Sequence, residues 1–237
     1  MISILIFGFL LGLRHAIEAD HVAAVASMAT RSTSLADGIR MGATWGMGHT
    51  LTLLLFGSIV IFSDSLIPEN MALSLEFVVG IMLVALGADV IYRMRKERIH
   101  FHVHEHADGI KHFHAHSHAN EGAHKESTHE HKHKKKFPLR PLFVGMMHGM
   151  AGSAALIILT LQTVETPTMG FVYIFIFGFG SVAGMAMMAM IIMIPLRHSA
   201  KRLTHVYGRI QATIGVATLG LGFYVMYEIG IVQGLVV

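Results

Sequence analysis

Cysteine is absent from the 237-residue chain, so the protein forms no disulfide bond and offers no thiolate ligand to zinc or copper. Charged residues are scarce: Asp, Glu, Lys and Arg make up 14% of the chain, whereas soluble domains contain about 25%. The phosphate-binding pattern G-x-x-x-x-G-K-[ST] is missing, which excludes an ATPase of that kind. Hydrophobic residues make up 53%, and the mean hydropathy is +0.58. We therefore predict an all-α, polytopic protein whose partner is the lipid bilayer and not nucleic acid.

Six stretches of the sequence are candidates for transmembrane helices, each of which needs about 20 mostly apolar residues. They cover residues 2–29, 37–62, 71–93, 139–163, 168–196 and 207–235. All of the 18 Lys and Arg residues except Arg14 lie in or beside the segments 30–36, 94–138 and 197–206. Because basic residues are enriched in cytoplasmic loops, we expect these loops in the cytoplasm and both termini outside the cytoplasmic (inner) membrane.

The two halves of the chain repeat a pattern of glycine, histidine and tyrosine at a nearly constant spacing. The matching pairs are Gly12 and Gly145, His15 and His148, Gly48 and Gly180, His49 and Ser181, Gly80 and Gly215, Gly87 and Gly222, and Tyr92 and Tyr227. Three spans in each half require the second copy to be inverted, as in transporters with a midplane substrate site. We expect repeats at 1–95 and 139–237, joined by 96–138. The alternative is a helical bundle with small residues at its contacts.

Four ionisable residues interrupt the first apolar stretch: His15, Glu18, Asp20 and His21. Each such group at bilayer depth costs about 2.5–3.5 kcal/mol on insertion scales, which suggests a functional need. On a straight helix, His15, Glu18 and His21 share an arc of about 120°, whereas Asp20 lies about 100° from His21. Either the helix is kinked, or Asp20 orients a histidine ring instead of binding an ion. An ion pair between Asp20 and Arg14 is the structural alternative.

Two further histidines are candidate ligands from other spans, His49 in the second and His148 in the fourth. Histidine with carboxylate, and without thiolate, suits a divalent metal cation. A buried histidine that bonds a backbone carbonyl is the alternative for each. Ser181 and Trp45 are expected to pack, and so are the methionines of the fifth span, because they surround the helix instead of forming a copper-binding stripe.

The segment from Arg14 to Val22 contains His15-x4-Asp20-His21 and resembles the H-x4-D-H signature of the nickel–cobalt transporter (NiCoT) family. Gly48-His49-Thr50 resembles that family's Gly-His-Ser motif. The resemblance implies an integral membrane permease for Ni²⁺ and Co²⁺ whose first motif recognises the metal. The chain departs from the family pattern at Glu18, where an Asp is usual, and in having six expected spans instead of eight. The short form also resembles urease-accessory-type permeases and nickel–cobalt efflux proteins.

The segment 100–133 contains twelve histidines, many of them in His-x-His pairs. It has few apolar residues, so we expect a disordered cytoplasmic loop. Imidazoles at this density bind several divalent metals, which favours a metal buffer, sensor or hand-off site over a plain linker. The resemblance implies cytosolic metallochaperones or urease and hydrogenase maturation proteins as partners.

These features predict a secondary transporter that carries Ni²⁺ or Co²⁺ as its substrate and needs no cofactor. Uptake is favoured, because the resemblance to the H-x4-D-H form implies it. An inside-negative potential of 100 mV would drive a dication inward by about 4.6 kcal/mol, from about 2.3 kcal/mol per charge, so uptake could need no coupled ion. Efflux, with the His-rich loop as cytosolic collector, is the first alternative. A membrane metalloenzyme with Glu18 as general base and a metal-holding accessory protein are the others; we expect no enzymatic activity.

Overall fold

The computed structural model describes residues 2–63, 68–97, 100–105, 111–116, 138–163, 166–202 and 204–236. Helices dominate these segments. They are α1 (Ile2–His15), α2 (Ala19–Ala29), α3 (Leu35–Ser63), α4 (Glu69–Glu97), α5 (Leu139–Thr163), α6 (Pro167–Arg202) and α7 (Thr204–Tyr227), which continues into a π-helical turn, η1 (Glu228–Val232). Two strands, β1 (His100–Glu105) and β2 (Lys111–His116), complete the described elements.

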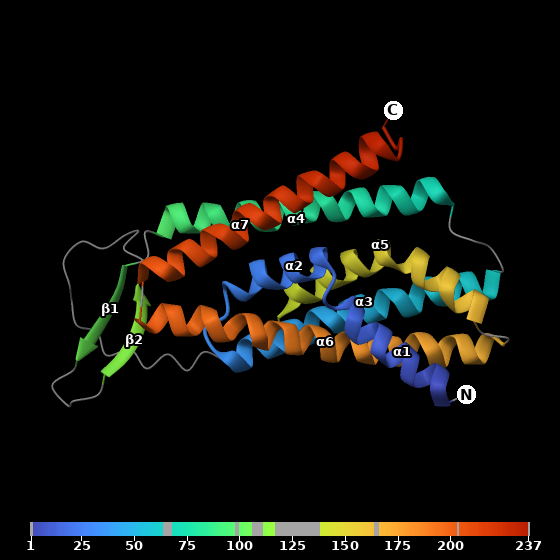
Figure 1. Cartoon of the computed structure of the whole chain (residues 1–237), viewed down its shortest axis with the longest axis horizontal. Helices are drawn as coiled ribbons and strands as arrows, with labels where there is room; N and C mark the ends of the chain where they lie inside the picture. The colour runs from blue at the N-terminus through green and yellow to red at the C-terminus, as the bar shows by residue number, and fades with distance from the viewer. Residues whose placement is uncertain are drawn as a thin grey trace.

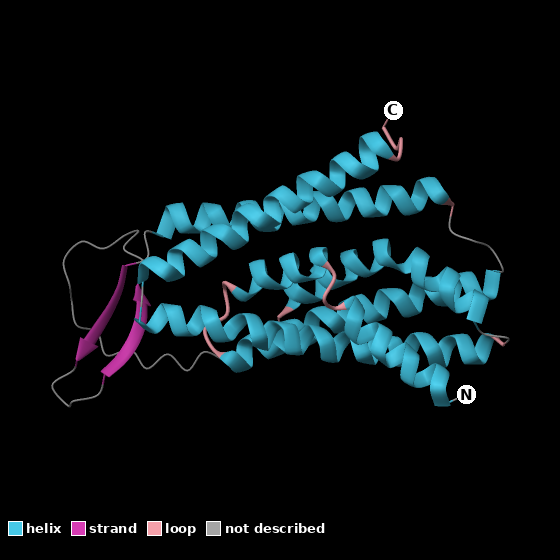
Figure 2. Cartoon of the chain, in the orientation of Figure 1, coloured by secondary structure: helices cyan, strands magenta, loops and turns pink. Residues whose placement is uncertain are grey.

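The long helices run along one axis of the molecule, with both chain ends at one end and β1 and β2 at the other (Figure 1). Helices α4 and α7 pack together as one layer, and α3, α5 and α6 form a second layer in which α3 contacts both of the others. Helix α1 lies against α6, and α2 contacts both α6 and α7, so α2 bridges the layers (Figure 2). The buried core therefore includes side chains from both layers and from α2.

Four of the described helices are long and apolar enough to cross a membrane: Leu35–Ile61, Glu69–Lys96, Pro167–Ala200 and Val206–Val232. They coincide with four of the six predicted spans and identify a multi-pass helical membrane protein. Helix α5 matches the predicted stretch 139–163 in its bounds. The remaining prediction, one span at 2–29, is divided by the structure into two short helices, α1 and α2.

The first predicted span is interrupted between His15 and Ala19, where the sequence analysis left open a kink. The amide N–H of Ile17 donates to the Arg14 carbonyl (3.0 Å), and that of Glu18 donates to the His15 carbonyl (3.1 Å). These short-range bonds tighten the last turn of α1. Glu18 then adopts an extended backbone (φ −63°, ψ 149°), and α2 begins at Ala19. The chain therefore changes direction in the middle of the span.

Glycines bring the helices of the two halves into close contact, and the contacts occur in related pairs. Gly12 of α1 lies against the Phe177 carbonyl on α6, and Gly145 of α5 lies against the Trp45 carbonyl on α3. Gly145 is the counterpart of Gly12 in the sequence repeat, and Phe177 corresponds to Trp45 in the same way. A β-carbon at either glycine would collide with backbone, so only glycine permits this approach.

The contact between α4 and α7 also consists of two related glycine contacts. A β-carbon added at Gly87 would lie 2.7 Å from the Gly215 oxygen, and one added at Gly222 would lie 2.8 Å from the Gly80 oxygen. Gly215 and Gly222 are the counterparts of Gly80 and Gly87, so each contact has its partner contact at the spacing of the sequence repeat.

Part of the loop that was expected to be disordered contains the antiparallel strands β1 and β2. Their register pairs His100 with His116, His102 with His114 and His104 with His112. The expectation of disorder is wrong for these two segments, because histidine there alternates with β-favouring residues such as Phe101 and Val103, and a period of two is typical of strands. The remaining His-rich positions, 106–110 and 117–137, lie outside the described residues.

Candidate metal centre

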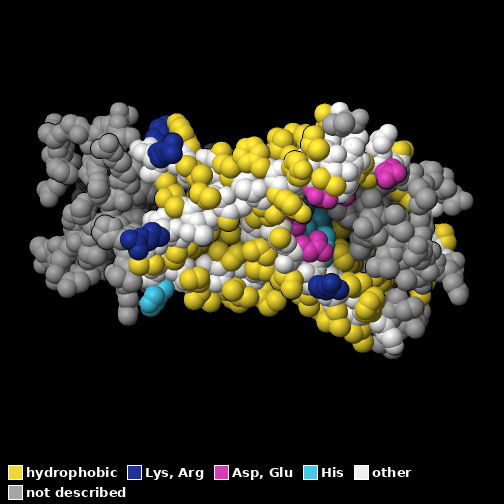
Figure 3. All heavy atoms as spheres, turned by 45° about the horizontal axis from the view of Figure 1, so that its top comes forward, with side chains coloured by type: hydrophobic (Ala, Val, Ile, Leu, Met, Phe, Trp, Pro, Cys, Tyr) yellow, Lys and Arg dark blue, Asp and Glu magenta, His cyan; other side chains and the backbone are white. Residues whose placement is uncertain are grey.

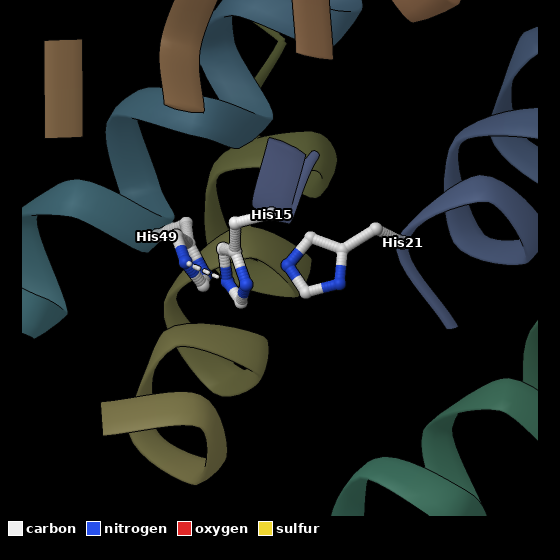
Figure 4. Close-up of side chains that lie close together, drawn as sticks. All are labelled: His15, His21 and His49. Atoms are coloured by element: carbon white, nitrogen blue, oxygen red, sulfur yellow. Dashed lines mark hydrogen bonds between the residues drawn. The ribbon is translucent and has the colours of Figure 1, made fainter. Parts of the chain in front are cut away.

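Four histidines from four helices meet at the break between α1 and α2. His15 is the last residue of α1, and His21 lies in the first turn of α2. His49 comes from the middle of α3, and His148 comes from α5. Because the chain turns between α1 and α2, His15 and His21 point toward each other and toward His49 (Figure 4). The sequence analysis left open a kink or an orienting role for Asp20, and the structure has both: the helix breaks here, and Asp20 hydrogen-bonds two histidine rings.

The first potential ligand group consists of His15, His21 and His49, whose ligand atoms all lie within 4.8 Å of one another. The Nε2 atoms of His15 and His49 are 3.1 Å apart. Two nitrogens that bind one ion at about 2.0–2.1 Å, with an angle of about 90–110° between them, lie about 2.9–3.4 Å apart. The two rings share a hydrogen bond in this structure, and their separation also fits two ligands on one metal ion once the shared proton has left.

A second potential group consists of Asp20, His21 and His148. Asp20 accepts hydrogen bonds with both carboxylate oxygens, from His21 Nδ1 at 2.9 Å and from His148 Nε2 at 2.8 Å. Glu18 accepts in the same way from His15 Nδ1 at 3.0 Å. A carboxylate that accepts a hydrogen bond from the N–H of one ring nitrogen leaves the lone pair of the other nitrogen free for a metal. The carboxylates therefore fix the rings in a metal-binding tautomer.

Several buried nitrogen atoms at this centre lack hydrogen-bond partners. Among the described residues, the buried side-chain atoms without a partner are His21 Nε2, His49 Nδ1, His148 Nδ1 and Trp45 Nε1. His49 is 0% exposed, and His21 and His148 are each 1% exposed. Leaving a buried polar group unsatisfied costs about 1–3 kcal/mol, so such groups call for an explanation. Their concentration at one point indicates a site built for a ligand.

Aromatic side chains pack around the histidines. The Trp45 ring lies 5.3 Å from the His21 ring and 5.6 Å from the His148 ring, between ring centroids. Phe177 lies 5.4 Å from His15. Ser181 is fully buried and donates to the Gly12 carbonyl at 3.3 Å, so its hydroxyl joins α6 to α1. These contacts surround the ring cluster with packed side chains on the α3 and α6 side.

A cavity of about 710 Å³ reaches the centre from the layer formed by α4 and α7. His15, Asp20, His21 and His148 lie in its wall. Figure 3 shows carboxylates and histidine gathered in a hollow of this face, on the side of the molecule away from most Lys and Arg side chains. The histidine centre is therefore accessible from one direction.

Further carboxylates line this cavity that the sequence analysis did not include in the site. Glu76 comes from α4, and Glu228 lies at the start of η1. Glu76 could have been predicted from the sequence, because it is a carboxylate inside an apolar span, as Glu18 and Asp20 are. Glu228 carried none, because a carboxylate near the end of a span is ordinary. By contrast, the structure brings together all six residues that the sequence analysis proposed.

Neither a protein-family model nor a solved structure matches the chain. A curated relative does: the urease accessory protein UreH of Bacillus sp. (strain TB-90) is 38% identical over 236 residues. The alignment covers 99% of this chain and 95% of that relative. The chain belongs to the UreH family. Membership covers both halves of the molecule, so it extends well beyond the two short motifs in the first two predicted spans.

Proposed function

We propose that this UreH-family protein is a secondary transporter that carries Ni²⁺ or Co²⁺ across the cytoplasmic membrane. The observation that carries the proposal is the set of buried histidine nitrogens without partners at a break in a membrane helix. Broken helices at bilayer depth are typical of transporters, which place irregular backbone at their ion sites. The cavity supplies a path by which a hydrated ion reaches His15, His21 and His148, which lie in its wall.

The ligands of the transported ion are His15, His21 and His49. Asp20 holds His21 and His148 in place, and Glu18 holds His15, as the hydrogen bonds of their carboxylates indicate. His148 is an additional ligand for the ion as it moves, because its Nδ1 has no partner. Imidazole ligands alone do not select nickel or cobalt over copper, so selectivity depends on the geometry of the site.

Six spans arranged as two inverted repeats, at 1–95 and 139–237, are the architecture that we propose. The repeated glycine contacts support it, because an inverted repeat predicts that helix contacts recur between related positions. The contact of α1 with α6 corresponds to the contact of α5 with α3. The contact of α4 with α7 corresponds to itself, because the repeat exchanges these two helices. In this architecture α1 and α2 together form the first span.

The proposed orientation puts both termini outside and the His-rich segment in the cytoplasm. Both termini lie at the end of the molecule opposite β1 and β2 (Figure 1). The last turns of α4 and α6, which carry Lys and Arg side chains, lie at the same end as the strands (Figure 1), as the positive-inside rule requires. Uptake is the proposed direction, because the membrane potential then drives the dication inward.

Cytosolic maturation proteins that load a metalloenzyme are the partners that we propose for the imported metal. The name of the relative, a urease accessory protein, supports a role in supplying such an enzyme. It also favours a second candidate, a protein that only holds metal for that enzyme. Efflux is supported by the His-rich segment, which would collect metal on the cytoplasmic side. No enzymatic activity is proposed.

Nickel flux across sealed vesicles of both orientations tests the proposal. We expect right-side-out vesicles that contain the protein to accumulate Ni²⁺ when the inside is negative, and His15→Ala, Asp20→Ala or His21→Ala to stop this. His198→Ala, which removes an exposed histidine near the end of α6, is the matched control. Accumulation in inside-out vesicles alone would reverse the direction. Binding without flux in either orientation would favour the metal-holding protein.

A further inference from the structure

A cluster of ion pairs closes the molecule at the end opposite to the open cavity. Asp89 of α4 accepts two hydrogen bonds from Arg31, at 2.6 and 2.7 Å. It also contacts Arg93 of the same helix and Arg140 of α5, each at 3.3 Å. Three guanidinium groups thus surround one carboxylate and join the end of α2 to α4 and α5.

The same end of α2 is held by further polar contacts. Arg93 donates to the Thr30 hydroxyl at 2.9 Å, and this hydroxyl donates to the Ser27 carbonyl at 2.7 Å. Ser27 in turn shares a hydrogen bond of 2.9 Å with Thr218 of α7. Because α2 also carries Asp20 and His21, these contacts fix the helix that supplies two residues of the metal centre.

An apolar layer separates this cluster from the histidines. Val25, Met28, Leu83 and Leu86 are all buried in the main core. A second cavity, of about 300 Å³, lies beyond the layer and is lined by Arg31, Asp89 and Arg140 together with Asp37 and Leu86. None of the six candidate site residues lines it. The path from the centre is therefore shut on this side and open on the other.

The closed and the open regions use related positions of the two halves. Leu86, Asp89 and Arg93 correspond to Leu221, Tyr224 and Glu228 at the spacing of the repeated glycines in α4 and α7. The first three belong to the closed region. The last three line the open cavity. The same positions of the two helices thus face a closed end in one half and an open end in the other.

We propose that Asp89 with Arg31, Arg93 and Arg140 is the cytoplasmic gate, and that the structure is the state open to the outside. Release of the ion into the cytoplasm requires Arg31 and Arg140 to leave Asp89, which frees the end of α2 to move. Breaking the cluster shifts the population toward the state open to the cytoplasm. This gate rests on the proposed transport function, since only a transporter needs both states.

Thiol labelling of single-cysteine variants tests the gate, because the natural chain contains no cysteine to remove. Leu221→Cys reports on the open cavity, and its counterpart Leu86→Cys reports on the closed one. A membrane-impermeant thiol reagent is applied to sealed vesicles of both orientations. We expect rapid labelling of Leu221→Cys from outside and slow labelling of Leu86→Cys from either side.

When Asp89→Asn or Arg31→Gln is added to the Leu86→Cys protein, we expect labelling from the cytoplasmic side to become about tenfold faster. This is the ratio expected from the loss of one charge-assisted hydrogen-bonded pair. Labelling of Leu221→Cys should slow in the same proteins. Arg95→Gln, which removes an exposed charge from the same end of α4, should change neither rate. If Leu86→Cys fails to insert, Met41→Cys reports on the same cavity.

Unchanged labelling of both positions in Asp89→Asn and Arg31→Gln would overturn the gate. Rapid labelling of Leu86→Cys from the cytoplasmic side in the otherwise natural chain would also overturn it. Labelling requires no metal, so this result is independent of nickel flux. A normal gate response with no flux would refute the proposed cargo alone, whereas normal flux with unchanged labelling would refute the gate alone.

Discussion

The first helices of the two halves have related sequences but different shapes. His15 and His148 occupy related positions, yet α1 ends at His15 whereas α5 continues past His148 to Thr163. The first half then adds Asp20 and His21 on α2, where the second half has Ser153 and Ala154. In the proposed architecture a symmetric scaffold carries an asymmetric site: one span breaks and supplies most of the proposed ligands, and its counterpart supplies a single histidine.

Among the variants that test this asymmetry, His21→Ala should reduce Ni²⁺ binding and flux most, because His21 belongs to both potential ligand groups. We expect His21→Ala to weaken Ni²⁺ binding and reduce flux at least about 100-fold, beyond the 10–100-fold loss typical of an outer partner. Isothermal titration and vesicle flux measure the two quantities. His148→Ala should cost less, because the continuous helix supplies only an additional ligand. Equal losses in both variants would contradict the asymmetry.

Neutralising Asp20 should have the next largest effect, because its two oxygens hold two histidines. We expect Asp20→Asn to weaken Ni²⁺ binding about 10–100-fold, the loss typical when a carboxylate that orients a ligand is removed. Glu18→Gln is the comparison variant. The Glu18 carboxylate contacts His15 alone and is 55% exposed, so its loss should weaken Ni²⁺ binding less. A Glu18 variant that bound nickel more weakly than the Asp20 variant would reverse these roles.

Glycine substitutions test whether the two halves share one packing scheme. Gly12→Ala and Gly145→Ala each place a methyl group against backbone, that of Phe177 or Trp45. Overpacking of this kind costs about 1–3 kcal/mol of stability, and the two losses should be similar. Thermal unfolding in detergent measures both. Gly220→Ala, at a helical position with nothing within 4 Å, is the control and should stabilise the protein by about 0.5–1 kcal/mol.

Exchanging Glu18 for aspartate should have the smallest effect. The NiCoT pattern has aspartate at this position, and either carboxylate can accept a hydrogen bond from His15 Nδ1. We expect Ni²⁺ affinity to change less than about threefold, since both side chains keep one charge-assisted hydrogen bond. Titration of the purified Glu18→Asp protein measures this. A large loss would show that the longer side chain sets the geometry of the break.

The sequence predicted the membrane helices and the site residues for different physical reasons. Apolar stretches mark helices because lipid demands them, and His15, Asp20, His21, His49 and His148 were conspicuous because charge is costly in lipid. The break itself was not predictable in position, because residues 16–18 contain neither glycine nor proline. Gly12, the glycine that precedes the break in α1, stays helical and serves the contact with α6.

Residues whose role depends on the tertiary arrangement were the ones that sequence reasoning missed. Asp89 is an ordinary helix residue until α2 and α5 bring Arg31 and Arg140 beside it. Glu76 and Glu228 join the site only because the break leaves a cavity open toward α4 and η1. The roles of these carboxylates follow from helix packing, which a single sequence does not encode in any local pattern.

The most direct measurement of the central claim is the position of bound nickel in crystals of the full chain, located by anomalous scattering. We predict a peak between the ring nitrogens of His15, His21 and His49 that disappears in His21→Ala crystals. Nickel bound elsewhere, for example only at the His-rich segment, with this cluster empty at saturating Ni²⁺, would show that these histidines are not the transport site.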